Sequence, residues 1–465
     1  MEIDAKPQAA VEPGLSGELA TWAAGVTLDQ IPAEVVRDAK LRILDIIGVA
    51  IAGSATEAGR IVRDGALAIG GGGDSRILGY GDRTTPGAAA IANGVLAHIH
   101  DYDDTHSGAR IHVSNPIVST VLGLGAGRAT GGDDALLALI VGAELTCRVG
   151  IVEPALFHTR GFHTTGVIAA IGAAFAAAKI LRLPPRATQN AIGIVASQAS
   201  GISECFSDGT WTKRLHPGWA AQSGIRAALL ARGGFTGPRT VFEGVHGLFH
   251  GFAHTTQGDY DALIGGFGER WVTETLAFKP YPCGTMAHPY IDCAKRLAAR
   301  GVKPADVKEL VCEVAEGTVH RLWEPLADKQ RPPNGYAAKF STPFLLATGF
   351  VRGGVGLDAF TEQAVRDKDV LALSSKVRYV IDPDNPYPNN FTGHIRALLN
   401  DGRVIEERQP HFRGGAHEPL TRADVGEKFI LNVRHGGWDD RRAVAALKQL
   451  AKFYEGKIDL AFLRG

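Results

Sequence analysis

The chain has 465 residues, and its 49 basic side chains (Lys and Arg) are balanced by 49 acidic ones (Asp and Glu), so its formal charge at pH 7 is zero. This length exceeds what one hydrophobic core ordinarily supports, and we expect at least two domains. Because a chain without net charge has no global field to attract nucleic acid or anionic lipid, neither is an expected partner.

The cysteines indicate a reducing compartment. There are five, widely spaced and without a CxxC pair, which excludes most iron–sulfur and zinc patterns. The N-terminus lacks a basic-then-apolar signal pattern, and the longest apolar runs, at 135–141 and 166–178, are too short or too rich in Gly and Ala to cross a membrane. We therefore predict a cytoplasmic protein without a membrane role.

From about residue 15 to 270, apolar residues recur with helical spacing, in segments rich in Ala and Gly. Small residues let helix axes approach closely, which indicates a large helical bundle. The glycine run Gly70 to Gly73 follows no predicted strand and does not match GxGxxG, so a dinucleotide-binding fold is not expected.

The pattern changes after residue 270. Segments 307–319 and 374–384 show β-branched alternation, and 391–410 reads as a hairpin with an Asn-Asp-Gly turn at 400–402. Residues 441–456 return to a helical pattern. We predict a mainly α protein, with a large all-helical domain built from both chain ends (1–270 and 411–465) and a smaller α+β lid domain (271–410).

A cluster of histidines and aspartates lies at 98–106 (HIHDYDDTH). Pro86 is well placed to start a helix, and if that helix continues past His98, then His98, Asp101 and Thr105 share one face. The cluster fits a metal site, an acid–base site or a solvated helix end. Because His98 and His100 diverge on a helix, we expect no metal.

A second candidate lies at 207–217, where Lys213, Arg214 and His216 precede a helix that starts near Pro217. A helix N-terminus with two cations beside it suits a carboxylate or phosphate, although plain surface charge is the alternative. His288 before Pro289 repeats this arrangement, and His163 precedes a third helix start. Histidines at helix N-termini tend to be neutral at pH 7 and able to accept a proton, although structural histidines are also common.

Several segments resemble the methylcitrate-dehydratase-like MmgE/PrpD family. They are ILDIIGVAIAG (43–53), 77–106, GFHTTGVIAAIGAAFAAAKIL (161–181), 208–238, KPYPCGTMAHPYIDCA (279–294), AKFSTPFLLA (338–347) and 417–429. The resemblance implies a helical domain built from both chain ends, an α+β lid, an active site in the cleft between them, and a homodimer. Family members include 2-methylcitrate dehydratase, cis-aconitate decarboxylase and iminodisuccinate epimerase, which act on small di- or tricarboxylates without an iron–sulfur cluster, so we expect no cofactor.

Carried over by motif, the family's pocket positions fall on Asp101, Thr105, His112, His163, Lys213 and His288. Two departures stand out. Phe344 occupies the place of a tyrosine in the decarboxylase branch, which lowers the expectation of itaconate chemistry. His112 comes one residue later than the family spacing.

The resulting hypothesis is a lyase that dehydrates a small hydroxy di- or tricarboxylate. Lys213, with Arg214, His216, Thr105 and Phe344 as further substrate contacts, would hold the substrate. His163 or His288 would move the carbon-bound proton, Asp101 would orient a histidine and His112 would protonate the departing hydroxyl. The alternatives are an epimerase, a decarboxylase and, from a different class, a metal-dependent hydrolase.

Overall fold

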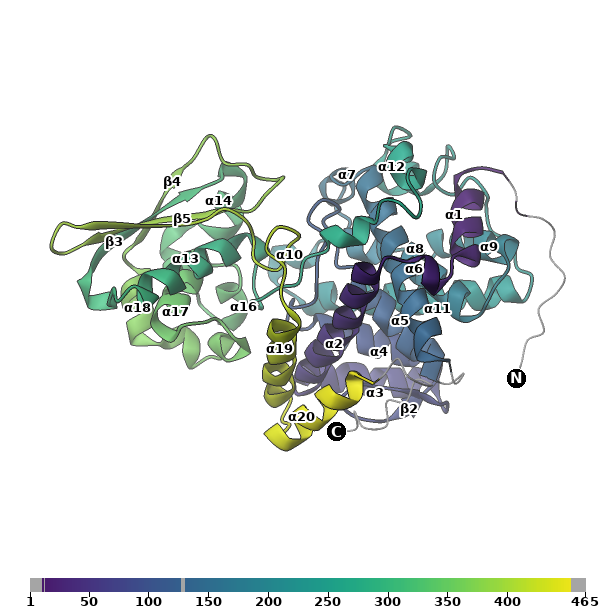
Figure 1. Cartoon of the computed structure of the whole chain (residues 1–465), viewed down its shortest axis with the longest axis horizontal. Helices are drawn as coiled ribbons and strands as arrows, with labels where there is room; N and C mark the ends of the chain where they lie inside the picture. The colour runs from purple at the N-terminus through teal and green to yellow at the C-terminus, as the bar shows by residue number, and fades with distance from the viewer. Residues whose placement is uncertain (1–10, 12, 127–129, 453–465) are drawn as a thin grey trace. The chain divides into compact units, whose positions relative to one another are not determined.

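A computed structural model describes residue 11 and residues 13–126 and 130–452 (Figure 1). Contacts divide the chain into two compact units. The first, here called the helical unit, comprises Met1–Ile99, Asp103–Leu276 and Arg422–Gly465. The second, the mixed unit, comprises His100–Tyr102 and Ala277–Thr421. The predicted mainly α fold is confirmed.

The helical unit is a bundle of helices with one very short strand pair, β1 (Ser75–Arg76) with β2 (Arg83–Thr84). Its α-helices are α1 (Leu15–Gly25), α2 (Ala33–Ser54), α3 (Glu57–Gly70), α4 (Pro86–His98), α5 (Ser114–Ala126), α6 (Gly132–Val152), α7 (Leu156–Thr159), α8 (Thr164–Ile180), α9 (Pro185–Ala196), α10 (Cys205–Asp208), α11 (His216–Arg232), α12 (Tyr260–Ile264), α19 (Arg422–His435) and α20 (Asp440–Leu450). The predicted helix starts at Pro86, after His163 and near Pro217 are confirmed.

Small residues bring the central helices together, as the composition predicts. Helix α8 is buried along almost its whole length. Helices α4 and α11 meet at Gly94 and Gly218, where a Cβ added to Gly94 would lie 2.5 Å from the Gly218 Cα. The backbones therefore touch directly, and only glycine fits.

Helix α6 corrects one expectation about apolar runs. The run 135–141 appears short, but the helix continues through Glu144 and Arg148, which pair with each other at 2.6 Å inside the unit. The helix is 21 residues long, and an 18-residue window within it has a mean hydropathy of 2.0, so by length and composition it passes as a membrane span. In the structure, 94% of that window is buried. Its apolar character matches its central place in the bundle.

The chain's last described helices pack back on the helical unit. Helix α19 lies along α2 (Figure 1). Lys428 Nζ lies 2.7 Å from the Asp45 carboxylate, and both side chains are buried. Phe429 lies against Gly48, where a Cβ would come within 3.0 Å of its ring. Helix α20 ends at Leu450, and the predicted helical stretch beyond 452 lies outside the described residues.

The mixed unit contains a four-stranded sheet in the order β4 (Val377–Ile381), β3 (Val307–Val314), β5 (Gly393–Leu399) and β6 (Val404–Gln409). Strands β3 and β4 are parallel, and the other neighbours are antiparallel. The predicted hairpin at 391–410 is confirmed, with Gly402 at φ +88° in its turn. Its α-helices are α13 (His288–Ala299), α14 (Glu316–Leu322), α15 (Leu326–Gln330), α16 (Gly335–Ala338), α17 (Thr342–Arg352) and α18 (Lys368–Ser374).

Hydrogen bonds of the chain on either side of residue 276 stay within one unit each. Residues 272 and 273 donate their N–H groups to the Glu144 carboxylate in the helical unit, at 3.1 and 3.0 Å. Phe278 N–H donates to the Gly414 carbonyl at 2.9 Å within the mixed unit. The divisions after 276 and after 421 therefore differ from the expected boundaries at 270 and 410.

The segment His100–Tyr102 belongs to the mixed unit because that unit's side chains hold it. Lys339 Nζ donates to the His100 carbonyl at 2.9 Å, and Tyr102 Oη donates to the Pro280 carbonyl at 2.9 Å. The expected continuation of α4 through this segment is wrong. The helix ends at His98, and Asp101 has φ +54°, which breaks helical geometry, so His98, Asp101 and Thr105 do not share a helix face.

Candidate active site

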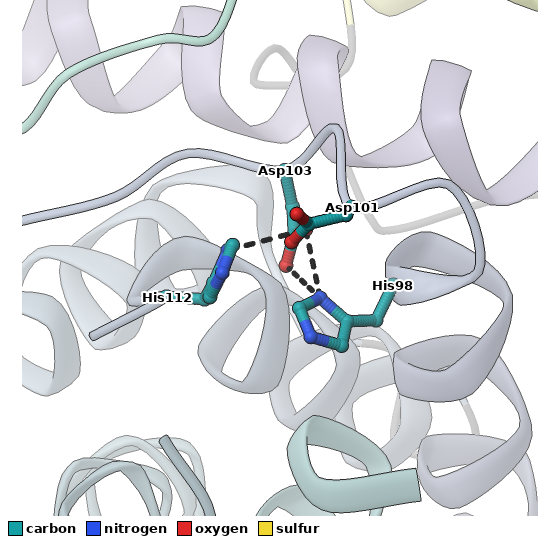
Figure 2. Close-up of side chains that lie close together, drawn as sticks. All are labelled: His98, Asp101, Asp103 and His112. Atoms are coloured by element: carbon teal, nitrogen blue, oxygen red, sulfur yellow. Dashed lines mark hydrogen bonds and ion pairs between the residues drawn. The ribbon is translucent and has the colours of Figure 1, made fainter. Parts of the chain in front are cut away.

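Two histidines meet one buried carboxylate at the end of α4 (Figure 2). His98 Nδ1 lies 2.9 and 3.0 Å from the two oxygens of Asp103, and His112 Nδ1 lies 3.3 Å from Asp103 Oδ1. Asn115 Nδ2 donates to Asp103 Oδ2 at 2.9 Å. Since an ionised carboxylate only accepts hydrogen bonds, it favours the tautomer of His98 that carries the proton on Nδ1 and the lone pair on Nε2.

These residues come from three consecutive pieces of chain. His98 is the last residue of α4, Asp103 lies in the loop that follows, and His112 and Asn115 flank the start of α5. The His112 N–H also donates to Thr165 Oγ1 at 3.1 Å, which ties this loop to the first turn of α8. The sequence folds this way because α4 stops at His98 and the chain returns to start α5 only sixteen residues later.

Two more histidines complete the group, which we call the histidine cluster: His98, His112, His163 and His216. His163 caps α8 and His216 begins α11, and their Nδ1 atoms lie 2.9 Å apart. One of these nitrogens must donate and the other accept, so the two rings share a single proton between them. The His163 ring centroid lies 6.2 Å from that of His98 and 6.4 Å from that of His112.

Burial keeps much of the cluster neutral. It lowers the pKa of His98 to about 4, although Asp103 partly opposes the shift. Burial and then the charge of Lys213 lower the pKa of His163 well below 6.5, and the same two causes lower the pKa of His216 to about 4. For Asp103 burial acts to raise the pKa, but His112 and His98 outweigh it and the pKa falls well below 3.8. At pH 7 the site therefore presents neutral His98, His163 and His216 rings around an anionic Asp103.

Lys213 supplies the positive charge of the site. It lies in the short helix η2 (Trp211–Leu215), directly before α11, and is partly buried. Its charge acts on the pKa of His98, His163 and His216, which places it at the histidine cluster. The Arg214 guanidinium lies over the Trp211 ring at 5.2 Å. Substrate contacts by Lys213, Arg214 and His216 stay predictions.

Asp103 takes the place that was expected for Asp101. The carboxylate that orients His98 is Asp103, whereas the Asp101 carboxylate pairs with Lys279 at 3.3 Å, and Lys279 Nζ also donates to the Asp101 carbonyl at 2.5 Å. The sequence reasoning chose Asp101 because it assumed a continuing helix, and for the same reason it missed the pairing of His98 with Asp103. The usable signal was the Asp103-Asp104 pair, which places carboxylates beyond the helix end.

Two predicted residues lie in the mixed unit. His288 begins α13 as expected, but it is fully buried there, with Nε2 3.2 Å from the Cys283 carbonyl and its ring against Tyr281 and Phe412. Phe344 is 1% exposed and belongs to the mixed unit's hydrophobic core, which assigns it a packing role. Their contact with substrate stays a prediction.

The remaining predicted contact, Thr105, lies two residues after Asp103 in the helical unit. Its Oγ1 is buried and has no hydrogen-bond partner among the described residues, as is also true of His98 Nε2. Because buried polar atoms are nearly always paired, these two atoms are expected to meet a polar molecule.

His98, Asp103 and His112 are also residue types that bind divalent metals, and their donor atoms lie close together. In this arrangement, however, both Nδ1 atoms face the carboxylate and Asn115 donates to it as well. The donors are paired with one another, which is the arrangement of an acid–base group. The expectation of no metal stays a prediction.

Comparisons with known proteins identify the family of this chain. Residues 17–261 match the MmgE/PrpD N-terminal domain and residues 281–451 the MmgE/PrpD C-terminal domain. Human cis-aconitate decarboxylase is 29% identical over 97% of this chain and 93% of its own length. The cis-aconitate decarboxylase of Aspergillus terreus is 27% identical (90% and 88%), and the cis-aconitate decarboxylase-like protein oryM of Aspergillus oryzae is 28% identical (90% of each).

These matches span nearly the whole chain, with the N-terminal domain followed by the C-terminal domain, and they point to a lyase-type enzyme. The relatives are similar to this chain at a level that leaves the substrate open. The two domain matches together cover far more than half of the residues, and on that ground the chain belongs to the MmgE/PrpD family.

Proposed function

We propose that this protein is a cofactor-independent lyase that moves a proton at a carbon next to a carboxylate of a small polycarboxylate. The observation that carries the proposal is the Asp103 carboxylate placed between the Nδ1 atoms of His98 and His112. This arrangement turns the Nε2 atoms into oriented proton-transfer groups.

Removing a proton next to a carboxylate places negative charge on that carboxylate in the transition state. A preorganised cation lowers the energy of this charge most effectively in a site that excludes water. Lys213 is the cation at the histidine cluster, and its partial burial strengthens its interaction with an anion. We therefore assign it the substrate carboxylate.

Dehydration needs a base for the carbon-bound proton and an acid for the departing hydroxyl. We assign the base to His163, because its lowered pKa keeps it neutral and ready to accept a proton. We assign the acid to His112, because Asp103 at 3.3 Å stabilises the charge that the ring carries while it holds the proton to be donated. The favoured substrate is a hydroxy di- or tricarboxylate of the 2-methylcitrate type.

Decarboxylation is the second candidate, and the relatives described as cis-aconitate decarboxylases favour it. In that reaction loss of CO2 leaves an electron pair on carbon, and His112 would deliver a proton to it. No base is required, so His163 would serve only to position the substrate. The two reactions therefore make different demands on His163.

The test is turnover of a panel of small polycarboxylates in D2O, followed by NMR. The panel contains citrate-like hydroxy acids and cis-aconitate. A new C=C bond formed with loss of water supports the dehydratase, and release of CO2 with deuterium at the former carboxyl-bearing carbon supports the decarboxylase. Failure to turn over any member of the panel would contradict the lyase proposal.

Variants sharpen this test. Lys213→Ala and His112→Ala should abolish either reaction, while His163→Ala should abolish dehydration but only slow decarboxylation. His250→Ala is the matched control, because His250 is an exposed histidine of the same unit outside the histidine cluster. A homodimer and a cytoplasmic location stay predictions alongside this function.

A further inference from the structure

Asp104, the residue after Asp103, is also held by several hydrogen bonds, but to Arg42 and Ser114 and not to the histidines. The carboxylate of Asp104 is completely buried. Its Oδ1 accepts the Ser114 N–H at 2.9 Å, and its Oδ2 accepts the Ser114 hydroxyl and Arg42 Nη1, the latter at 2.9 Å. Because the Ser114 N–H lies at the N-terminus of α5, the helix dipole also favours this negative charge.

Arg42 is itself fixed in place on α2. Its Nε donates to Asp38 at 2.9 Å, and its Nη2 donates to the Leu276 carbonyl at 2.9 Å. The Arg42 side chain is 5% exposed and that of Asp104 is 0% exposed. A buried guanidinium with several fixed acceptors is a rigid anchor rather than a mobile surface charge.

Two consecutive carboxylates, Asp103 and Asp104, accept hydrogen bonds from two consecutive residues at the start of α5, Asn115 and Ser114. Asp103 therefore faces the histidines while its neighbour Asp104 faces α2, so the position of one carboxylate fixes the position of the other. A shift of the Asp104 carboxylate away from Arg42 would move Asp103 relative to His98.

We propose that Arg42 and Asp104 are positioning residues that hold the Asp103 carboxylate in register with the histidine cluster. This inference rests on the proposed function for its effect on turnover. Its structural content, the fixed pairing of Asp103 with His98, is measurable without any substrate. A change as small as 1 Å at a proton-transfer group is enough to lower turnover by about 100-fold.

The principal test is Asp104→Asn, which keeps the shape of the side chain and removes the charge that Arg42 holds. We expect kcat to fall about 10- to 100-fold with little change in KM, because the substrate does not touch Asp104. In ¹⁵N NMR of the imidazoles, His98 should change from a single Nδ1-protonated tautomer to a mixture. Ser114→Ala, a milder change that keeps the Arg42 pair, should show a smaller effect in the same direction and covers the case that Asp104→Asn fails to fold.

Glu144→Gln is the matched control. Glu144 is also a fully buried carboxylate that binds an arginine, Arg148, and two backbone N–H groups, but it orients no histidine of the cluster. It should lower the thermal midpoint as Asp104→Asn does, with kcat and the His98 tautomer unchanged. This separates positioning from a general loss of stability.

Chemical rescue gives an independent readout for Arg42. Arg42 and Ser114 line a pocket of about 220 Å³, together with Val35, Leu139, Ala143 and Thr273, and the rim includes the exposed Glu34. Added guanidinium ions at millimolar concentration should restore part of the kcat of Arg42→Ala through this pocket, whereas tetramethylammonium should not, because it has no N–H groups to donate to Asp104.

The proposal is overturned if Asp104→Asn and Ser114→Ala both keep the wild-type His98 tautomer, or if Glu144→Gln disturbs it equally. These results are distinct from a failure of the proposed function, in which the wild-type protein turns over no polycarboxylate while the tautomer measurements still give an answer. Loss of kcat in Asp104→Asn with a wild-type tautomer would also count against it.

Discussion

The Asp103 carboxylate binds His98, which lies five positions earlier in the chain, with both oxygens within 3.0 Å of the ring nitrogen Nδ1. Asp103→Asn should keep the shape of this contact but present an amide that no longer selects the Nδ1-protonated ring. We expect kcat to fall by roughly 10²- to 10⁴-fold, the range of general acid–base catalysis. Steady-state kinetics measure this, with a substitution of the exposed Asp133, Asp133→Asn, as control, and an Asp103→Asn enzyme within threefold of wild type would refute the assignment.

Lys213 should control the pH at which the enzyme loses activity in acid. Its charge contributes to the lowered pKa of His163, His98 and His216. In Lys213→Met these pKa values should rise toward 6.5, so the acidic limb of the kcat/KM profile should move to higher pH. In Lys213→Arg the limb should stay close to its wild-type position.

The kcat/KM profile of Lys213→Met is measured at high enzyme concentration, because loss of the cation leaves little turnover. NMR titration of the histidine rings gives the same answer without turnover. An unchanged titration of His163 in Lys213→Met would show that the lysine does not act on the ring.

Buried neutral histidines should make the fold sensitive to acid. The pKa values of His98, His106 and His216 are each lowered to about 4, chiefly by burial, from about 6.5 in the unfolded chain. Between pH 6.5 and 4 the unfolded chain thus binds more protons, and the free energy of unfolding decreases as the pH falls through this window. Each histidine contributes at most about 3 kcal/mol to the loss.

Urea denaturation at several pH values from 7.5 to 4.5 measures the slope. His106→Gln should reduce it, because it removes one of the three groups, while the exposed His250→Ala should leave it unchanged. A free energy of unfolding that does not vary between pH 6.5 and 4.5 would contradict the buried neutral state.

The ion pair between Asp45 on α2 and Lys428 on α19 should show strong coupling. Both side chains are buried, and Nζ lies 2.7 Å from the carboxylate. Asp45→Asn alone leaves a buried ammonium group without its counterion, so we expect a loss of about 3–5 kcal/mol. Asp45→Asn combined with Lys428→Met should lose less than either single change, and a double-mutant cycle by chemical denaturation tests this.

Activity should survive treatment with a chelator, and elemental analysis of the purified protein should find no stoichiometric metal. The reason is that the Asp103 oxygens are already bound by the two imidazoles and Asn115. Added Zn²⁺ would compete for the same donors and is expected to inhibit. Activity that is lost with chelator and restored by Zn²⁺ would favour a hydrolase instead.

The sequence predicts the large features of this molecule well. Helix starts at Pro86 and after His163, the hairpin at 391–410 and the mainly α architecture follow from periodicity, helix-start residues and turn residues. These signals are local, so no knowledge of the tertiary fold is needed to find them.

The site itself is only partly predictable. His163, Lys213 and His216 were singled out because helix starts and charges mark them, and His112 because of the resemblance to the MmgE/PrpD family. The pairing of His98 with Asp103 was missed because it depends on a helix that ends at His98 and on a loop conformation with Asp101 at φ +54°. Such a turn is held by partners distant in sequence, among them Lys279, and no local pattern records them.

The contact of Gly94 with Gly218 carries a consequence for the chemistry. One glycine lies a turn before His98 and the other two residues after His216, so the point where the two helices touch is next to the ends that bear the histidines. Because no side chain separates them, neither helix can shift along or rotate against the other without a backbone clash. The spacing between His98 and His216 is therefore set by direct contact of the two backbones, and a methyl group introduced at Gly94 or Gly218 would push these two imidazoles apart.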